Sequence, residues 1–482
     1  MEKRQSGPGT SLVAERPRRR LRMLRRVLMA SVTGTAAVGG ALMLLPKEPS
    51  VTGPPAPAPG PRAPAAVTSG VPAALPELTR LIGDRENHLR THPRDARAWA
   101  VLGTAYLQRG RQTADAANYP QAEHALQTSL EVAGGANVEA LEGLAALANT
   151  RRDFAAAREW GEQANKLAPK RWTTYAVLID SYTGLGDYKA SRSTLDKLMA
   201  LRTGAAARPA VMARASAVYR DRGWREDAAA QLSDAAAAAR SPAERADYLT
   251  RAGQLAWERG DRQDALRHFD AALRADPGQR AATAGRGRVL AALGRTSEAL
   301  TAYRSALSGQ PCPEYALELG ELYESLGRQE EAQAQYDLVR TRAERDQAGG
   351  VDEELLLGRF EEDHGNREDA VVLLEDEWER QPGIEVADAL GWALHRVGDD
   401  EEALHYARVA TDKDKGGGVR SALYSFHLGM IEGELDQTGP ARRHLQEALR
   451  INPYFSPLRV PVAREALARL GEPPDDEPPP EG

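Results

Sequence analysis

Cysteine, aromatic residues and lysine are all scarce in this sequence of 482 residues. Cys312 is the only cysteine, so no disulfide can form within the chain. Aromatic residues make up 5% of the chain and its mean hydropathy is -0.51, which argues against one large core of bulky side chains. Lysine supplies only 8 of the 63 basic residues, and with so many alanines and arginines this composition is typical of a high-GC bacterium. The commonest residues are good helix formers.

Catalytic and metal-binding motifs are also missing. There is no His-Glu-x-x-His zinc motif, no Gly-x-x-x-x-Gly-Lys phosphate loop and no Gly-x-Ser-x-Gly nucleophile motif. His88 and His92 are spaced to share a helix face, but no third metal ligand accompanies them. The net charge of -6 gives no general attraction to nucleic acid. The sequence therefore predicts a non-enzymatic protein with no catalytic residue, no metal, no cofactor and no nucleic-acid partner.

The amino-terminal end joins a basic segment to an uncharged one. Residues 1–26 hold nine lysines and arginines against two acids, and residues 27–45 contain no charge. A helix of that length nearly spans a hydrocarbon core of about 30 Å. We interpret residues 27–45 as a transmembrane signal anchor and residues 1–26 as a cytoplasmic tail, because the basic side stays in the cytoplasm. The remaining chain is then extracytoplasmic and held at the cell membrane by a single pass.

Two alternatives remain for this amino-terminal end. One is a cleaved secretory peptide, after which the rest of the chain is secreted. The other is a cytosolic chain with an incidental apolar helix. The apolar run is longer than a signal peptide usually needs, and the nearest small-residue cleavage sites fall among prolines, so we favour the uncleaved anchor.

Proline-rich segments lie on both sides of the central part of the chain. Residues 46–76 hold ten prolines among alanine, glycine and valine, a composition that favours neither a core nor a helix. We expect an extended linker there, which would hold the following residues away from the membrane. Residues 472–482 are acidic and rich in proline, and we expect a disordered tail.

A spaced pattern of small residues recurs in the central part. Five glycines are each followed seven residues later by a second glycine, and five residues after that by an alanine. The first glycine predicts close approach of two helices, the second a helix end with positive φ, and the alanine a tight crossing. The copies recur at intervals of 33 to 38 residues, which indicates a repeat array. Their members are Gly253, Gly260 and Ala265; Gly287, Gly294 and Ala299; Gly320, Gly327 and Ala332; Gly358, Gly365 and Ala370; and Gly391, Gly398 and Ala403.

This pattern resembles the tetratricopeptide repeat, a helix-turn-helix unit of about 34 residues. The clearest copies are Ala246–Gln279 and Arg280–Pro313, which carry the small, aromatic and proline positions of the family. The resemblance implies an all-α fold: a right-handed superhelical solenoid of about ten repeats, preceded by the single transmembrane helix and the Pro-rich linker. The predicted boundaries are residues 77–95 for a leading helix, residues 96–455 for the repeat array and residues 456–471 for a capping helix.

The resemblance also implies where a partner binds. In such arrays the first helix of each hairpin lines a concave groove, and its outward positions contact the partner. The candidate partner-binding residues are Asp180, Thr183, Gln254, Trp257, Arg288, Glu321, Glu324, Arg359, Trp392 and His395. We single out the two tryptophans, because exposed tryptophans are frequent binding hot spots, with packing between helices as the alternative. The Lys and Asn set by which some family members hold a peptide carboxylate is absent, so we do not expect that mode of recognition.

The favoured function is a membrane-tethered scaffold or adaptor that binds a protein or peptide in this groove. An assembly factor of the cytochrome c maturation type is a second hypothesis, because Leu78–Tyr106, with its run His92-Pro93-Arg94-Asp95 and Trp99, resembles repeat proteins of that process. A secreted or cytoplasmic adaptor, and a component of an enzyme, are further alternatives. Residues 351–402 hold 18 acidic residues against 4 arginines, and form either a surface for a basic partner or a solvated outer face.

Overall fold

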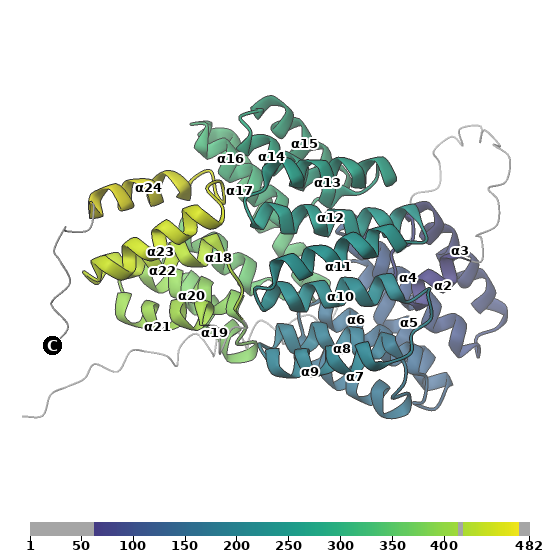
Figure 1. Cartoon of the computed structure of the whole chain (residues 1–482). Helices are drawn as coiled ribbons and strands as arrows, with labels where there is room; N and C mark the ends of the chain where they lie inside the picture. The colour runs from purple at the N-terminus through teal and green to yellow at the C-terminus, as the bar shows by residue number, and fades with distance from the viewer. Residues whose placement is uncertain (1–61, 413–417, 472–482) are drawn as a thin grey trace, which may run out of the picture. The chain divides into compact units, whose positions relative to one another are not determined.

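A computed structural model describes residues 62–412 and 418–471, all of which belong to one compact unit, Pro57–Gly482. Every element in these residues is an α-helix, and ten helical hairpins follow one another along the chain (Figure 1). The all-α fold and the number of about ten repeats are thereby confirmed. The hairpins are preceded by α2 (Arg62–Thr68) and α3 (Leu75–Thr91) and followed by α24 (Arg459–Leu470).

The first helix of each hairpin, here called the inner helix, contacts the return helix that follows it. The first five hairpins are α4 (Ala96–Thr113) with α5 (Asn118–Val132), α6 (Val138–Thr150) with α7 (Phe154–Leu167), α8 (Trp172–Gly184) with α9 (Tyr188–Ala200), α10 (Arg208–Asp221) with α11 (Arg225–Ala238), and α12 (Pro242–Glu258) with α13 (Arg262–Ala275). The last five are α14 (Arg280–Ala292) with α15 (Thr296–Gly309), α16 (Pro313–Ser325) with α17 (Gln329–Ala348), α18 (Glu354–His364) with α19 (Arg367–Arg380), α20 (Ile384–Arg396) with α21 (Asp400–Thr411), and α22 (Ala422–Glu434) with α23 (Thr438–Ile451).

The small residues of the repeat lie where helices meet. A Cβ atom on Gly253 would lie 2.7 Å from the ring of Phe269 on the return helix, so only glycine permits this approach. The alanines of the five copies are at most 1% exposed, as a tight crossing requires. Three of the ten return helices begin with a side-chain cap; in two of them the carboxylates of Asp153 and Asp187 each accept a hydrogen bond from a backbone N–H three residues later.

The second glycine follows the prediction in four of the five copies, which have positive φ. Gly365 has a φ of −146°, so the prediction of positive φ is wrong at this position. The carboxylate of Glu361 folds into the turn and accepts a hydrogen bond from the Asn366 N–H at 2.7 Å, and Asn366 caps α19. Side chains close this turn, and a left-handed residue is not needed.

The amino-terminal part differs from the prediction over residues 62–76. We expected an extended linker, but α2 forms there, and Ala63, Val67 and Ala73 are buried in the first hydrophobic cluster. The residues between the prolines are small and uncharged, so they pack against helices, and Pro76 lies in the first turn of α3, where proline is tolerated.

Other predicted segments lie outside the described residues: the tail 1–26, the anchor 27–45, the first part of the linker 46–61 and the acidic tail 472–482. Among the helices that the structure describes, none is both long enough and apolar enough to cross a membrane.

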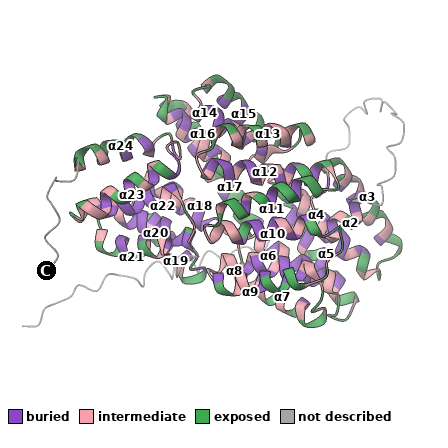
Figure 2. Cartoon of the chain, in the orientation of Figure 1, coloured by how far each residue is buried: buried purple, intermediate pink, exposed green. Residues whose placement is uncertain are grey.

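The hydrophobic core runs along the array as a series of clusters, each shared by neighbouring helices. Figure 2 shows buried residues on the helix faces that contact other helices and exposed residues on the faces that point outward. Phe269, Phe360 and Phe426 are among the largest fully buried side chains. Because the fully buried members of each cluster come from adjacent hairpins, the unit has mainly the local packing of a solenoid, although Val351 and Tyr454 pack on the clusters of the first and fifth hairpins.

Contacts between distant residues join hairpins that are five apart in the array. The turn of the third hairpin meets the loop after the eighth, where the N–H of Ile384 donates to the hydroxyl of Tyr188 at 3.1 Å. The first, second, fourth and fifth hairpins repeat this offset. Their contacts are Gln310 Nε2 to Arg111 O (3.0 Å), Asp352 N to Arg151 O (2.9 Å), close packing of Gly223 on Gly418, and Asn452 Nδ2 to Trp257 O (2.8 Å). We call this row of contacts the seam.

Candidate functional site

A cavity of about 1010 Å³ lies among the inner helices, and we call it the larger cavity. Its wall is formed by the inner helices from α8 to α22 and by residues 452–464, which connect α23 to α24 and begin α24. Seven of the ten predicted partner-binding residues line it: Asp180, Thr183, Gln254, Trp257, Arg288, Glu321 and Arg359. The structure therefore brings most of the predicted set around one space.

Hydrogen-bonded ion pairs connect successive inner helices along this wall. Arg220 on α10 donates two hydrogen bonds to the carboxylate of Glu258 on α12, at 2.7 and 3.0 Å. Arg288 on α14 donates to Gln254 Oε1 at 2.7 Å and to Glu318 Oε2 on α16 at 3.1 Å. These bonds hold four inner helices in register and leave their charges balanced.

Three polar side chains on the next inner helices keep free hydrogen-bonding capacity. Among the described residues, Arg359 on α18 donates only to the backbone oxygen of Glu385, at 3.3 Å. The carboxylate of Glu385 on α20 and the hydroxyl of Tyr424 on α22 have no hydrogen-bond partner in that part of the chain. Glu385 is exposed and Arg359 and Tyr424 are half-buried, so all three present accessible hydrogen-bonding groups to a ligand in the larger cavity.

The charge of Glu385 is favoured by its surroundings. Burial alone would raise the pKa of this carboxyl, but three nearby guanidinium groups outweigh burial and hold the pKa below its usual value. They belong to Arg359, Arg152 and Arg220. Asp221 differs, because burial and the carboxylates of Glu385 and Glu258 outweigh Arg220 and raise its pKa to about 6. The larger cavity therefore presents an ionised Glu385 at neutral pH beside the Arg359 cation.

The two tryptophans are not exposed as we expected. Trp257 lines the larger cavity but is only 7% exposed, and Trp392 is 5% exposed and lies outside it. The indole of Trp392 stacks on His427 with ring centroids 4.3 Å apart and donates to Asp363 Oδ1 at 3.2 Å. Both rings pack between helices, which was the alternative interpretation. A partner-binding role for Trp257 remains a prediction.

Two more predicted residues are engaged elsewhere in the array. Glu324 accepts a hydrogen bond from the hydroxyl of Tyr336 at 2.5 Å, and the Nδ1 atom of His395 lies 2.5 Å from Asp400 Oδ1. Neither lines the larger cavity. Both residues hold contact positions of their repeats, but each side chain already contacts another side chain of the same chain.

The segment that resembles cytochrome c maturation proteins includes the turn between α3 and α4. The rings of His88 and His92 stack with centroids 4.5 Å apart, and His88 Nε2 lies 2.9 Å from Asp95 Oδ2. Asp95 also caps α4, and the indole of Trp99 donates to Pro93 O at 2.9 Å. These hydrogen bonds are local to the turn, while the Trp99 ring also meets His124 of α5 edge-on, with ring centroids 6.2 Å apart.

One group of carboxylates in the described residues is dense enough to hold a metal ion: Asp352, Glu354 and Glu377. The guanidinium of Arg380 lies 2.8, 2.7 and 2.6 Å from their oxygen atoms and offsets part of their negative charge. This group therefore has the geometry of an ion-pair cluster, already filled by an arginine.

The comparisons with known proteins agree with the hairpin geometry. The tetratricopeptide repeat family model matches residues 68–117, 114–171, 250–311 and 285–347. The chain is a tetratricopeptide repeat protein. Repeats of this family form scaffolds for protein–protein interaction. A comparison with curated protein sequences gives no match.

Several solved structures are similar to this tetratricopeptide repeat chain. The human IFIT1 dimer with m7Gppp-AAAA is 17% identical, covers 68% of this chain and 75% of its own, and has a TM-score of 0.45. A tetratricopeptide repeat protein from Parabacteroides merdae is 18% identical, covers 55% and 99%, and has a TM-score of 0.32. Yeast Tom70 is 14% identical, covers 76% and 88%, and has a TM-score of 0.33.

Sequence reasoning missed part of the wall of the larger cavity. Glu385 is the second residue of its repeat, which is a contact position in the family, so the sequence could have indicated it. Tyr424 holds the third position, which the tetratricopeptide repeat pattern does not mark. Residues 452–464 were assigned to the end of the array and the cap, and nothing local in their sequence indicates that they face the inner helices.

Proposed function

We propose that the chain is a non-enzymatic scaffold that binds an extended segment of another protein in the larger cavity. The observation that carries this proposal is the cavity itself, whose wall is built largely from inner helices of successive repeats and presents Arg359, Glu385 and Tyr424, which have free hydrogen-bonding capacity. Its volume of about 1010 Å³ lies at the upper limit of ligand pockets, about 300–1,000 Å³. A folded domain does not fit such a space, whereas a thin segment does.

The free groups match the main chain of a polypeptide. Arg359 supplies donors, Glu385 supplies an acceptor and Tyr424 supplies both, and successive amides need both kinds. A polyanion such as nucleic acid would meet the Glu385 carboxylate and the acidic members of the paired wall, Glu258 and Glu318. The lining therefore favours a segment of mixed polarity.

Site-specific photo-crosslinking in cells tests this proposal. A photoreactive residue at Thr183, which lines the larger cavity on α8, should capture a partner protein. Arg359→Ala and Glu385→Ala should each lower the recovery of that partner about tenfold, which corresponds to about 1.4 kcal/mol of binding free energy.

Matched controls are available on the outer surface. Arg367→Ala and Glu368→Ala make the same chemical changes at the exposed start of α19, and recovery should be unchanged. Equal recovery from all four variants would contradict binding in the larger cavity.

We also propose that residues 27–45 anchor the scaffold in the cell membrane, with the repeats on the extracytoplasmic side. The proposal is supported by the basic residues before an uncharged run of sufficient length. Protease added to spheroplasts should degrade the repeats without lysis. Repeats that resist protease until the membrane is broken would contradict this topology and favour a cytoplasmic adaptor. Release of the repeats into the medium would instead indicate a cleaved, secreted form.

A further inference from the structure

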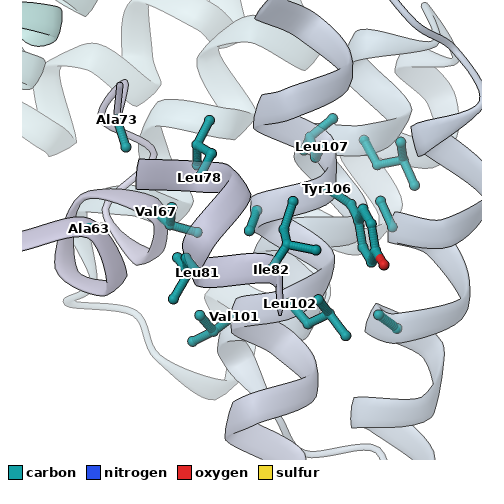
Figure 3. Packing of buried hydrophobic residues seen from close by; sticks show 14 of the residues in the cluster. Ala63, Val67, Ala73, Leu78, Leu81, Ile82, Val101, Leu102, Tyr106 and Leu107 are labelled. Carbon is teal, nitrogen blue, oxygen red and sulfur yellow. The ribbon is translucent and has the colours of Figure 1, made fainter. Parts of the chain in front are cut away.

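The chain's own residues 62–74 lie against the inner helices of the first repeats. Ala63 and Val67 on α2, and Ala73 after it, are 1%, 1% and 4% exposed. Figure 3 shows them packed with Leu78 and Leu81 of α3 and with residues of α4. This segment is part of the predicted proline-rich linker, residues 46–76.

Two glutamines of α4 bind the main chain of this segment. Gln108 Nε2 donates to Val71 O at 3.0 Å, and Gln108 Oε1 accepts from the Ala73 N–H at 3.3 Å. Gln112 Nε2 donates to Ala73 O at 2.8 Å. An inner helix thus recognises a stretch of non-helical polypeptide by its amides, which is how a repeat groove would hold a segment of a partner.

The same segment closes one side of a second, smaller cavity of about 100 Å³. The smaller cavity is lined by Val67, Thr68 and Pro72 and by residues of five successive inner helices, α4, α6, α8, α10 and α12. Residues 67–72 therefore border the part of the groove that belongs to the first five hairpins.

The smaller and larger cavities adjoin along the same helices. On α8, Val177 lines the smaller cavity and Asp180 lines the larger one. On α12, Arg251 lines the smaller cavity and Gln254 lines the larger one. Arg214, which lines the smaller cavity, lies 3.0 Å from Asp180 across this border. A partner segment that extends from the larger cavity toward the first hairpins would meet residues 67–72.

The docked segment is held weakly enough to leave. A helix of seven residues is unstable by itself, because isolated helices shorter than about 12 residues are marginal, so α2 depends on its docking. Its buried side chains are mostly alanine, and Ala63–Ala73 carries no charge, so no ion pair holds it. Its polar contacts with α4 are the three hydrogen bonds to glutamines, each of which contributes only modestly to stability in water.

We infer that residues 63–73 are an internal ligand of the groove, and that a long partner segment must displace them to occupy the first five hairpins. This inference rests on the proposed function, in which the groove binds a segment of another protein. Its consequence is a two-part site: the larger cavity is open to a short segment, and the full groove becomes available when residues 63–73 are released.

A synthetic peptide of residues 62–74 with a fluorescent label tests the inference on the purified full chain. In the wild type the linked segment competes at an effective concentration in the millimolar range, so the peptide should bind at least tenfold more weakly than to a released variant. Ala63→Asp introduces a buried charge and releases α2, so fluorescence anisotropy should show saturable binding. Adding Gln108→Ala and Gln112→Ala to this variant should abolish it.

The matched control makes the same change two residues later. Ala65 is exposed on α2, so Ala65→Asp should leave the segment docked and the peptide excluded. Equal binding of the peptide to the Ala63→Asp and Ala65→Asp chains, or no binding to either, would overturn the inference. Neither result bears on Arg359 or Glu385, so the proposed function is tested separately.

A second measurement covers the case in which Ala63→Asp fails to fold. Gln108→Ala with Gln112→Ala, in the otherwise unchanged chain, removes the hydrogen bonds to the segment without changing a buried apolar side chain. Hydrogen exchange in residues 63–73 should then accelerate at least tenfold while exchange in α14 and α16 stays the same. Unchanged exchange in residues 63–73 would also overturn the inference.

Discussion

At the scale of the residue, Glu353 is a buried carboxyl whose pKa is raised. It is 8% exposed at the start of α18, and burial together with the carboxylates of Glu314 and Asp346 raises its pKa to about 8. In the unfolded chain a glutamate titrates near pH 4.3. Between about pH 4 and 8 the folded chain binds more protons than the unfolded chain, so the free energy of unfolding falls as the pH rises through this window.

Glu353→Gln should remove this pH-dependent loss. We expect little difference from the wild type at pH 5, where the native carboxyl is protonated, and a more stable variant at pH 9. The gain should exceed about 1.4 kcal/mol, the value of one pKa unit. Thermal unfolding at pH 5, 7 and 9 measures it. Glu401→Gln, at an exposed position of α21, is the control. A stability difference for Glu353→Gln that is the same at pH 5 and pH 9 would contradict the burial of a neutral carboxyl.

Residues were predictable where the physical reason is local. The buried alanines and the first glycines of each copy follow from the crossing of two adjacent helices. The acidic stretch 351–402 was not predictable in the same way, because several of its carboxylates are buried and not on an outer face. Glu377 is fully buried 3.6 Å from Arg152 of the second hairpin, and Asp388 pairs with His427 on a later helix. Charge composition does not reveal partners that only the fold brings near.

At the scale of the element, glycines inside helices divide by what a side chain would meet. Gly253→Ala would place a methyl group 2.7 Å from the Phe269 ring, and we expect a loss of about 1–3 kcal/mol from overpacking. Gly83 on α3 has nothing within 4 Å, so Gly83→Ala should stabilise by up to about 1 kcal/mol through helix propensity. Urea unfolding of both variants measures the sign. A neutral or stabilising Gly253→Ala would show that close approach does not explain this glycine.

Most helices were predictable because the repeat pattern marks their ends and contacts. α2 was not, since its proline-rich composition indicates an extended chain, and the helix exists only where α3 and α4 provide a surface for it. The turn at Gly365 shows the opposite case. Its sequence matches the pattern, but the carboxylate of Glu361 closes the turn by a different route.

At the scale of the whole repeat unit, the seam decides how the groove is enclosed. Repeat sequences specify contacts between neighbours, whereas an offset of five hairpins depends on small rotations that add up along the array. The seam was therefore beyond sequence reasoning, and so was the contribution of residues 452–464 to the larger cavity. The inward-facing positions of single repeats could be predicted from the sequence, which is why seven of the ten predicted residues line that cavity.

Glycines of equal backbone conformation provide a test of the seam. Gly186, in the turn after α8, and Gly294, after α14, have φ of 71° and 74°. A Cβ atom at Gly186 would overlap the carbonyl oxygen of Pro382 across the seam, whereas nothing lies within 4 Å of one at Gly294. Both Gly→Ala changes carry the strain of a left-handed alanine, about 1 kcal/mol. Gly186→Ala should additionally separate the third hairpin from Pro382 at the seam.

The amide of Ile384 reports whether the seam parts, because its hydrogen bond to the Tyr188 hydroxyl crosses it. Hydrogen exchange at this amide should accelerate at least tenfold in Gly186→Ala and stay near the wild-type rate in Gly294→Ala. The melting temperature should fall further in Gly186→Ala than in Gly294→Ala. If both variants lose the same stability and protect Ile384 equally, the contact at Pro382 does not hold the two hairpins together, and the larger cavity is not enclosed by the seam.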